Sequence, residues 1–509
     1  MTLELRSRPL SASPLIALAG QPDTPAEWYE PRPDAEGWRR RVAETAVEFE
    51  GGAWLRALAP ALEAKSAAAV RLRRAANSGG VAVTTGQQPG LFGGPLYTWF
   101  KAMSALALAD ELEKLTGVPA APVFWAATDD ADFAEASETT VSMPGGAEVI
   151  RIESQAEGGL PMSAFPLGDL GAQLDALTRA CGSAPNGAVL DAVRAAYSPE
   201  STIGGAYVRL LRTILEPLGV AVLDASHPAV RGAGRPLLEQ ALAHGGELEA
   251  ALKQRSKVLK DAGHRAQVAH VAGRTLVFSN GSGGRHRVRV REAETLAGSK
   301  AADLSPNVLL RPVMERAILP TVAYVGGPAE IAYFAQVSAV ADGLGARRPL
   351  IVPRWSGVIV EPHVRKVLDR IGADVDDFAD PHAVETRVAR EQLPAGIVKA
   401  LKKARVRVES ALDELEKEDT AAGVLPAAVL EGAKRQLLHK LDRLERRYVA
   451  ATKRKGSELL TEVATARGAL YPNGKPQERA LNAIPLFAKY GGDVLTGILA
   501  KAREHAAAL

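Results

Sequence analysis

Four acidic side chains follow an apolar segment, PVFWAA, closely in the run TDDADFAEA: Asp129, Asp130, Asp132 and Glu135. Carboxylates at this density can hold an ammonium group or a magnesium ion, or exchange protons with a substrate. We take the three aspartates as candidate catalytic residues. For Asp132 there is an equal alternative, because an aspartate just before a helix often caps it.

A glycine-rich turn, in the segment VAVTTGQQPGLFGGPLYTWFK (residues 81–101), is the second candidate. A strand over Val81–Val83, a turn that allows positive φ, and a helix from Pro95 to about Leu115 form the kind of junction that binds anions through backbone N–H groups. The alternatives are a tight connecting loop and, for Lys101, a surface position. The candidate binding residues here are Gly86, Gln87, Gln88, Gly90, Gly93, Gly94, Tyr97 and Lys101.

A second glycine turn repeats this pattern in TVAYVGGPAEIAYF. Gly326 and Gly327 follow apolar residues, and a helix begins near Glu330, which we predict to be the general base at the edge of a crevice. The candidate binding residues here are Tyr324, Gly326, Gly327 and Tyr333, with Arg354 from PLIVPRWS as a further cation. Arg311 and Glu315 could clamp a substrate, although an ordinary ion pair is slightly favoured.

Five strand-like segments, each with a polar or glycine-rich exit, must position these residues. They predict an α/β fold whose core is a Rossmann-like, doubly wound parallel sheet. The carboxyl ends of parallel strands meet at one edge, so both glycine turns and the acids should share one crevice. The predicted strands are Val81–Val83, Pro122–Ala127, Val220–Leu223, the apolar run ending at Val325, and Leu350–Val352.

Two insertions interrupt this core and are expected to cover the crevice. The first spans residues 141–205. The second, residues 235–312, should hold one helix, LLEQALAHGGELEAALKQRSKVL, and strands AQVAHV, TLVFS and HRVRVRE with hairpin turns GR and NGSGG between them. The core then comprises residues 1–140, 206–234 and 313–382.

The C-terminal third changes character at about residue 383. Apolar residues at 4-3-4 spacing predict an antiparallel helical hairpin within residues 383–470, suited to a subunit contact. Residues 471–509 should form helices that fold back onto the core. The predicted seam consists of Ile397, Leu401, Ala404, Val408, Ala411 and Leu415, then Leu437, Leu441, Leu444, Tyr448 and Ala451.

Composition excludes several classes of protein. A net charge of +3 over 509 residues favours neither a nucleic-acid nor a membrane partner, and the start lacks a convincing signal peptide, so we expect a cytoplasmic protein. The single cysteine, Cys181, permits no internal disulfide or cysteine-based zinc site. Neither a P-loop nor a G-x-G-x-x-G dinucleotide fingerprint is present.

The motifs TGQQPGLFGGPLYTWFK, PVFWAATDDADFAEA, SPNVLLRPVMERAILPTVAYVGGPAEIAYFAQ, PLIVPRWS and GKPQERALNAIPLFAKYG together resemble the bacillithiol biosynthesis cysteine-adding family, BshC. The resemblance spans about Val81 to Gly491. It implies a Rossmann-like core with two insertions and a coiled-coil domain for homodimerisation. It also implies a ligase that joins cysteine to glucosaminyl malate in the last step of making bacillithiol.

Two positions depart from the family pattern. Ala131 stands where the family commonly has histidine between acids, so proton transfer by that histidine has no agent here. Ala329 replaces a frequent glycine, a milder change. A non-catalytic dimeric homologue, or a nucleotidyltransferase-like enzyme acting on another small acceptor, is therefore an alternative to the ligase.

Amide formation from a carboxylate and an amine in water is unfavourable, so the carboxylate needs activation. We expect ATP or another nucleotide, with magnesium as an option. The glycine turns would hold phosphate or carboxylate groups, with Lys101 and Arg354 as cationic help, and the aspartates would hold an amine or Mg²⁺. A second anion-friendly surface surrounds Lys475 and Arg479 in the terminal turns. The sequence leaves the choice of nucleotide site open.

Overall fold

The computed structural model describes residues 3–10, 13–19, 21, 24–153, 159–281, 284–299, 302–380 and 382–509. They form two compact units. The larger, here called the body, comprises Leu3–Val141, Val149–Ile359 and Glu478–Leu509. The smaller, here called the hairpin unit, contains Val360–Gln477 and the short segment Ser142–Glu148.

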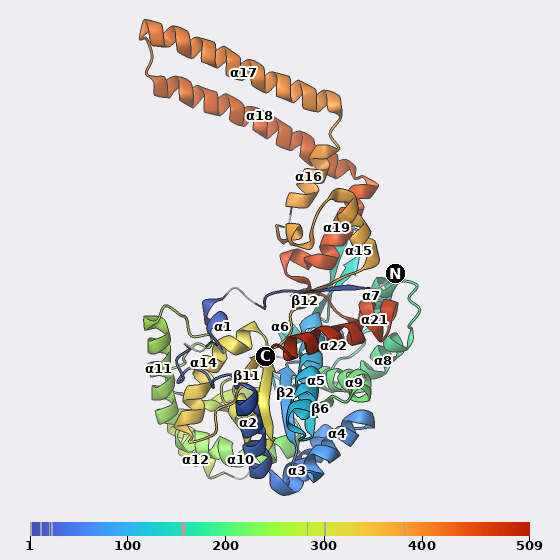
Figure 1. The fold of residues 1–509 in the computed structure, drawn as a ribbon, viewed down its shortest axis with the longest axis vertical. Helices are drawn as coiled ribbons and strands as arrows, with labels where there is room; N and C mark the ends of the chain where they lie inside the picture. Colours follow the sequence, from blue (N-terminus) through green and yellow to red (C-terminus); the bar gives the residue numbers. More distant parts are fainter. Residues whose placement is uncertain are drawn as a thin grey trace. The chain divides into compact units, whose positions relative to one another are not determined.

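A five-stranded parallel sheet lies at the centre of the body, and each strand matches one of the five predicted (Figure 1). The doubly wound prediction is confirmed. The strand order is β11 (Ile351–Pro353), β10 (Thr321–Gly326), β2 (Val81–Gln87), β3 (Ala120–Ala126) and β6 (Ala221–Asp224).

Both faces of this sheet are covered by helices, because alternate residues of each strand point to opposite sides. Val81 and Val83 pack with α2 (Ala35–Glu48) and α5 (Leu96–Thr116). Ala82 belongs to the core cluster on the other face, which includes residues of α3 (Ala53–Leu62), α4 (Ser66–Asn77), α10 (Pro228–Ala243) and α14 (Pro328–Gly343).

Helix α5 lies deep in the body, with fourteen of its 21 residues buried. It begins after Pro95 and ends at Gly117, whose φ of 72° is the left-handed conformation that glycine accepts at a helix end. Helix α22 (Asp493–Ala506) packs against α5. The last helix of the chain thus lies against the core of the body.

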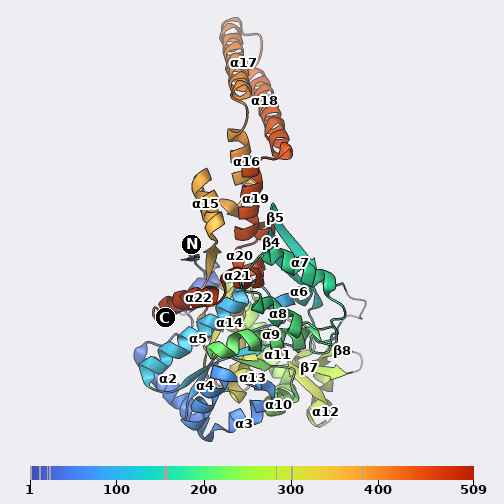
Figure 2. The ribbon, with the colours of Figure 1, turned by 90° about the vertical axis from the view of Figure 1, so that its right-hand side faces the viewer.

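The described part of the second insertion contains two longer helices, the short helix α12 (Ala293–Ala297) and a three-stranded antiparallel sheet (Figure 2). The single predicted helix is wrong, because the chain breaks at His244 between α10 and α11 (Gly245–Asp261). AQVAHV is not a strand, whereas TLVFS and HRVRVRE contribute to β7 (Arg274–Gly281) and β8 (Gly284–Arg289). The third strand is β9 (Asp303–Pro306). Residues 282 and 283 of the predicted turn lie outside the described residues.

The first insertion contains β4 (Glu138–Met143) and β5 (Gly146–Arg151), followed by α7 (Gly171–Cys181) and α8 (Ala188–Ala196). Helix α8 packs on α9 (Ile203–Leu215), which contacts β6 and β3 of the central sheet. Cys181 is buried at the end of α7, which fits a packing role for this side chain.

The hairpin unit carries two long antiparallel helices, α17 (Ala395–Ala422) and α18 (Ala427–Lys455), joined by a short turn (Figure 1). The predicted helical hairpin is confirmed. The unit begins at Val360, earlier than residue 383, because α15 (Pro362–Ile371) and α16 (Ala383–Glu391) pack on α19 (Glu458–Leu470).

The seam of the hairpin differs from the prediction. Helix α18 buries Leu430 and Val449, one position away from the predicted Tyr448. On α18 the buried stripe is therefore not the predicted one. It is a neighbouring stripe on the same helix, shifted by one residue. Four predicted seam residues therefore remain exposed: Leu415, Leu437, Leu444 and Tyr448.

No helix in the described part of the chain combines the length and apolar character that a membrane span requires.

Candidate active site

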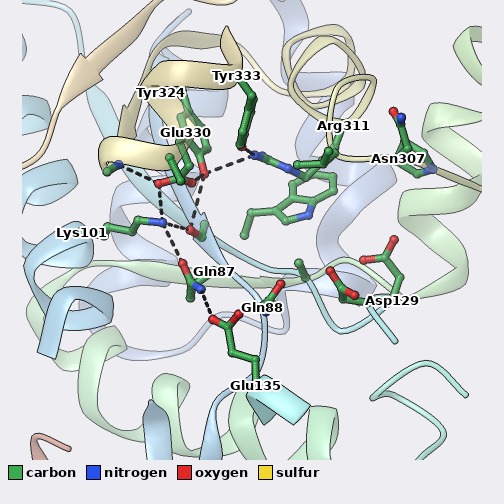
Figure 3. A pocket seen from close by; sticks show the side chains of 18 of the residues that line it. Gln87, Gln88, Lys101, Asp129, Glu135, Asn307, Arg311, Tyr324, Glu330 and Tyr333 are labelled. Atoms are coloured by element: carbon green, nitrogen blue, oxygen red, sulfur yellow. Dashed lines mark hydrogen bonds and ion pairs between the residues drawn. The ribbon is translucent and has the colours of Figure 1, made fainter. Parts of the chain in front are cut away.

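A cleft of about 480 Å³ opens at the carboxyl ends of β2, β3 and β10 (Figure 3). The starts of α5 and α14, the helix α13 (Arg311–Ile318) and the small sheet of the second insertion complete its walls. This is the edge where doubly wound sheets bind ligands.

Most of the predicted site residues line this one cleft, where residues from both glycine-turn segments and two of the three predicted aspartates meet. They come from β2, α5, the turn after β3, β10 and α14. They are Gly86, Gln87, Gln88, Tyr97, Lys101, Asp129, Asp130, Tyr324, Gly327, Glu330, Tyr333 and Arg354.

Gly90, Gly93 and Gly94 do not line the cleft. Their turn is buried and held from behind by Asn482, whose Nδ2 donates to the carbonyl oxygens of Leu91 at 3.2 Å, Phe92 at 3.1 Å and Gly94 at 3.4 Å. The N–H groups of Gly93 and Gly94 donate within the turn. The N–H groups of Gly93 and Gly94 and three carbonyl oxygens of the turn are therefore already engaged, so these glycines position α5 rather than an anion.

The two remaining glycines have packing roles. Gly86 does not have positive φ; a Cβ there would lie 2.8 Å from the carbonyl oxygen of Trp125 on the neighbouring strand. Gly326 does not line the cleft, and its Cβ would lie 2.7 Å from Cδ1 of Ile351. Gly86 requires a residue without a side chain because the backbone of a neighbouring strand comes close, whereas at Gly326 the side chain of Ile351 would have to move to admit a Cβ.

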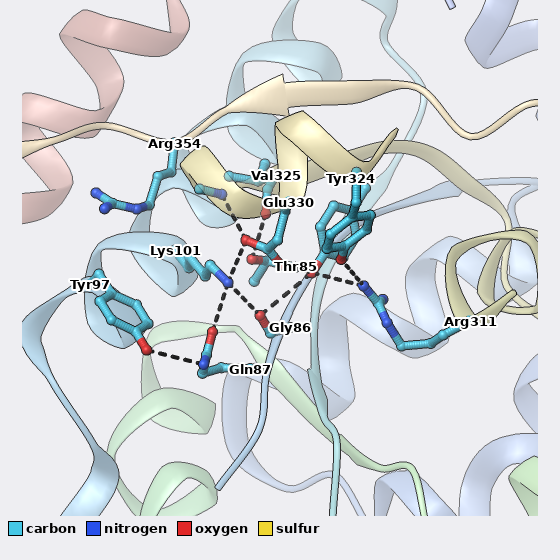
Figure 4. Close-up of polar contacts among 12 residues, drawn as sticks. Thr85, Gly86, Gln87, Tyr97, Lys101, Arg311, Tyr324, Val325, Glu330 and Arg354 are labelled. Carbon is cyan, nitrogen blue, oxygen red and sulfur yellow. Dashed lines mark hydrogen bonds and ion pairs between the residues drawn. The ribbon is translucent and has the colours of Figure 1, made fainter. Parts of the chain in front are cut away.

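Lys101 lies at the floor of the cleft and is only 3% exposed, so it is not a surface residue (Figure 4). Its Nζ donates to the carbonyl oxygen of Gly86 and to Oε1 of Gln87, both at 2.8 Å, and pairs with Glu330 at 2.5 Å. Burial lowers the pKa of Lys101, and the negative charge of Glu330 opposes this shift. All three ammonium protons are thus engaged within the protein.

Glu330 is held by three donors, which changes its predicted role. Its Oε2 accepts from Lys101 and from the backbone N–H of Gly327 at 2.7 Å, and its Oε1 accepts from the hydroxyl of Tyr324 (Figure 4). A carboxylate with both oxygens engaged is poorly placed to take a proton from a substrate. The geometry fits a positioning residue at the start of α14.

Arg311 forms the ion pair that the sequence favoured, with Nη1 2.6 Å from Oε2 of Glu315. It also lines the cleft, where Nη2 donates to the hydroxyls of Tyr333 at 3.0 Å and Tyr324 at 3.3 Å. Its guanidinium lies 4.8 Å from the ring centroid of Tyr324. This network connects α13 to β10, which carries Tyr324, and to α14, which carries Tyr333 and Glu330.

Arg354 lines the cleft but is neutralised by Glu478, with Nη1 and Nη2 at 3.0 and 2.7 Å from the two carboxylate oxygens. Its Nε is buried and has no hydrogen-bond partner among the described residues. One donor of this arginine is therefore unused.

The three aspartates do not act as one cluster. Asp129 pairs with Arg285 at 3.4 Å, and burial raises the pKa of Asp129. Asp130 accepts from the N–H groups of Ala131 at 2.6 Å and Asp132 at 3.1 Å. Asp132 lies outside the cleft lining and caps the short helix α6 (Phe133–Ala136), the alternative that its sequence position allowed. In the described ranges, no three His, Cys, Asp or Glu side chains gather in a metal-binding group.

The sequence analysis named Glu135 among the four acids after PVFWAA but did not predict a catalytic role for it. Its Oε1 accepts from the hydroxyl of Tyr97 at 3.2 Å and from Nε2 of Gln87 at 3.3 Å. Glu135 is exposed, but partial desolvation, together with the negative charges of Asp132 and Asp130, raises its pKa. Its Oε2 has no donor among the described residues, so this oxygen is available to a ligand.

The second insertion supplies cleft residues that were missed: Phe278, Arg285, Arg287, Pro306, Asn307 and Val308. A signal was present, because HRVRVRE places arginines at every second position and strand periodicity puts such residues on one face. As predicted, this insertion covers the crevice. No described residue of 141–205 lines the cleft, so the first insertion does not share that role. Trp125 is a further lining residue without a predicted role. Arg479, which the sequence placed with Lys475 on a second anion-friendly surface, also lines this cleft, whereas Lys475 does not.

A parallel, doubly wound sheet with a polar cleft at its carboxyl edge defines a Rossmann-like α/β protein with enzyme-like architecture. Family models agree with both parts of the chain. Residues 19–355 match the N-terminal Rossmann-like domain of bacillithiol biosynthesis BshC, and residues 357–508 match its C-terminal coiled-coil domain. The chain belongs to the BshC family.

Relatives named "Putative cysteine ligase BshC" resemble this chain over most of its length. The protein of Solibacter usitatus is 34% identical over 93% of this chain and 92% of its own. That of Koribacter versatilis is 33% identical over 84% and 82%, and that of Symbiobacterium thermophilum is 30% identical over 92% of both chains.

Proposed function

We propose that this protein is a carbon–nitrogen ligase that joins the carboxylate of cysteine to the amine of glucosaminyl malate in bacillithiol biosynthesis. The observation that carries the proposal is the family match over both domains, combined with a cleft in which cationic and acidic groups lie within one volume. An amide-forming enzyme needs both kinds of group, one for carboxylate oxygens and one for the amine.

The acidic wall of the cleft suits the amine. The ammonium group must lose a proton before its nitrogen can attack the cysteine carbonyl carbon. Glu135, with a raised pKa and an available oxygen, is the best base in this cleft, whereas Glu330 is engaged by Lys101 and Tyr324. Asp130 lines the same wall.

A nucleotide fits the cationic floor. Arg354 lies beside Gly327 at the start of α14, and its Nε has no partner among the described residues, so it can donate to an additional oxygen. Arg354 would hold a phosphate oxygen, while the engaged Lys101 would add positive charge nearby. The nucleotide would supply the leaving group that a free carboxylate lacks. Magnesium would have to take most of its ligands from phosphate and water, because the aspartates do not converge.

The test is to incubate the purified protein with ATP, cysteine and glucosaminyl malate and to seek the thiol product by mass spectrometry. Product formation that requires ATP supports the ligase. Loss of product in Asp130→Ala excludes the non-catalytic alternative. If the native chain forms no product while Ala131→His does, the residue at 131 has disabled this homologue and the proposal is wrong. ATP consumption with another acceptor only would favour the nucleotidyltransferase alternative.

Dimerisation through the hairpin unit is part of the same proposal. Nine large apolar side chains between Val398 and Tyr448 are exposed on the two long helices and their turn, among them the four that the seam prediction placed inside. A second copy of the hairpin would cover them. On α18, Val429, Leu437, Leu444 and Tyr448 lie on one side of the helix, and an exposed apolar stripe of this kind is unusual for a monomer.

A further inference from the structure

The charged side chains that line the cleft are not all paired. Six cationic side chains and four carboxylates face it. Four of the cations have acidic partners: Lys101 with Glu330, Arg285 with Asp129, Arg311 with Glu315, and Arg354 with Glu478. Among the described residues, Arg287 and Arg479 have no acidic partner, and the carboxylates of Asp130 and Glu135 have no cationic partner. The cleft therefore holds two unpaired cations, which are candidates for binding an anion, and two unpaired carboxylates.

Arg287 is the stronger of these two candidates. It is half-buried on β8, whereas Arg479 is exposed, and an exposed charge attracts a ligand only weakly in water. Strand β8 also holds Arg287 in a fixed place, directly opposite Phe278 of β7 in the antiparallel register.

Like charges surround Arg287. Arg285 precedes it by two positions on the same face of the strand, and the two guanidinium groups lie 4.1 and 5.6 Å from the ring centroid of Phe278. Arg274 donates to the carbonyl oxygen of Arg287 at 2.7 Å. Burial, with the positive charges of Arg274 and Arg285, lowers the pKa of Arg287. An anionic ligand would relieve this repulsion.

Asp129 lies beside Arg285 and is already paired with it, whereas Glu135 occupies another part of the cleft. Glu135 lies at the end near Gln87 and Gln88, and Figure 3 shows Asn307 of the second insertion well apart from it. The available carboxylate of Glu135 and the unpaired guanidinium of Arg287 thus give the cleft two chemically different ends.

We infer that Arg287, on the wall formed with Phe278 and Arg285, is the subsite for the carboxylates of the acceptor substrate. The acceptor would then lie with its dicarboxylate end against the second insertion and its amine toward Glu135. This inference rests on the proposed function, and it assigns substrate specificity to the insertion instead of the central sheet.

The test is calorimetric titration of the native protein and three variants with glucosaminyl malate, L-malate and methyl glucosaminide, which lacks carboxylates. Arg287→Ala should weaken binding of glucosaminyl malate at least about tenfold, since a charge-assisted contact is lost. The affinity of Arg287→Lys for glucosaminyl malate should lie between those of the native protein and Arg287→Ala, because lysine keeps the charge but lacks the planar guanidinium. Methyl glucosaminide should bind all proteins alike.

Arg289→Ala is the matched control, because Arg289 is on the same strand, is exposed and does not line the cleft. It should change each affinity by less than about twofold. Unchanged affinity of Arg287→Ala for glucosaminyl malate would overturn the inference, as would an equal loss for methyl glucosaminide. If glucosaminyl malate fails to bind, but L-malate binds the native protein and not Arg287→Ala, the proposed substrate is wrong while the assignment of Arg287 as a carboxylate subsite is supported. If neither ligand binds, both proposals fail.

Discussion

Glu135 and Glu330 show how surroundings divide two carboxylates in one cleft into different roles. Glu330 accepts from a buried lysine, a tyrosine and a backbone N–H group, so it organises the floor. Glu135 has only two long hydrogen bonds and a raised pKa. Residue type alone would not separate them.

The base assignment predicts a pH profile. A base works when deprotonated, so kcat/KM should rise with pH through the pKa of Glu135, above the ordinary value of about 4.3 for glutamate. Glu135→Gln should remove this limb and lower kcat/KM about 100-fold or more. Tyr97→Phe is the control: it deletes a hydrogen bond that lowers the pKa of Glu135, so the limb should move to higher pH while the plateau rate persists. A native-like profile in Glu135→Gln would contradict the assignment.

The buried pair of Lys101 and Glu330 predicts a stability effect. Lys101→Met should destabilise the body by about 3–5 kcal/mol, because it leaves the carboxylate of Glu330 buried without its cation. Adding Glu330→Gln should recover part of the loss, since it removes the unpaired charge. Urea unfolding of the single and double variants measures both effects. Additive losses would show that the two side chains are not coupled.

At the scale of elements, the segment after α20 (Gln477–Ala480) supports the start of α5. Asn482 is fully buried, donates to three carbonyl oxygens of the glycine turn and accepts from the N–H of Ile484 at 2.8 Å. The C-terminal segment is thereby part of the site architecture, although it lies far from the turn in sequence.

Asn482→Ala should accordingly cost about 2–3 kcal/mol in urea unfolding, because buried carbonyl oxygens lose their donor. The cleft residues on α5 should shift with the turn, so ligand affinity should fall too. Thr496→Ala, at an exposed position of α22, should stay within about 0.5 kcal/mol. Equal stability of Asn482→Ala and Thr496→Ala would refute this role.

At the scale of the whole molecule, the exposed stripe on α18 carries the prediction about assembly. Leu437 and Leu444 are 41% and 43% exposed and seven residues apart, hence on one side of the helix. Changing both to glutamate should convert a dimer into a monomer in sedimentation, because charges would be buried at the interface. Arg446→Glu, half a turn away from Leu437 around the helix, should stay dimeric. A dimer that survives the double change would rule out this surface.

Local sequence patterns determined the elements of this protein. Apolar runs, glycines and helix periodicity sufficed to predict all five strands of the central sheet and the helical hairpin. Parallel topology then placed two distant glycine turns and the acids at one edge, because strand direction alone decides which ends meet.

Tertiary structure alone decided the partners of the buried charges. Lys101 meets Glu330, Arg354 meets Glu478 and Arg285 meets Asp129, all between segments far apart in the chain. It also decided that Gly90–Gly94 face Asn482, and which apolar stripe of α18 is buried. Such choices depend on packing between distant segments, and local periodicity carries no information about that packing.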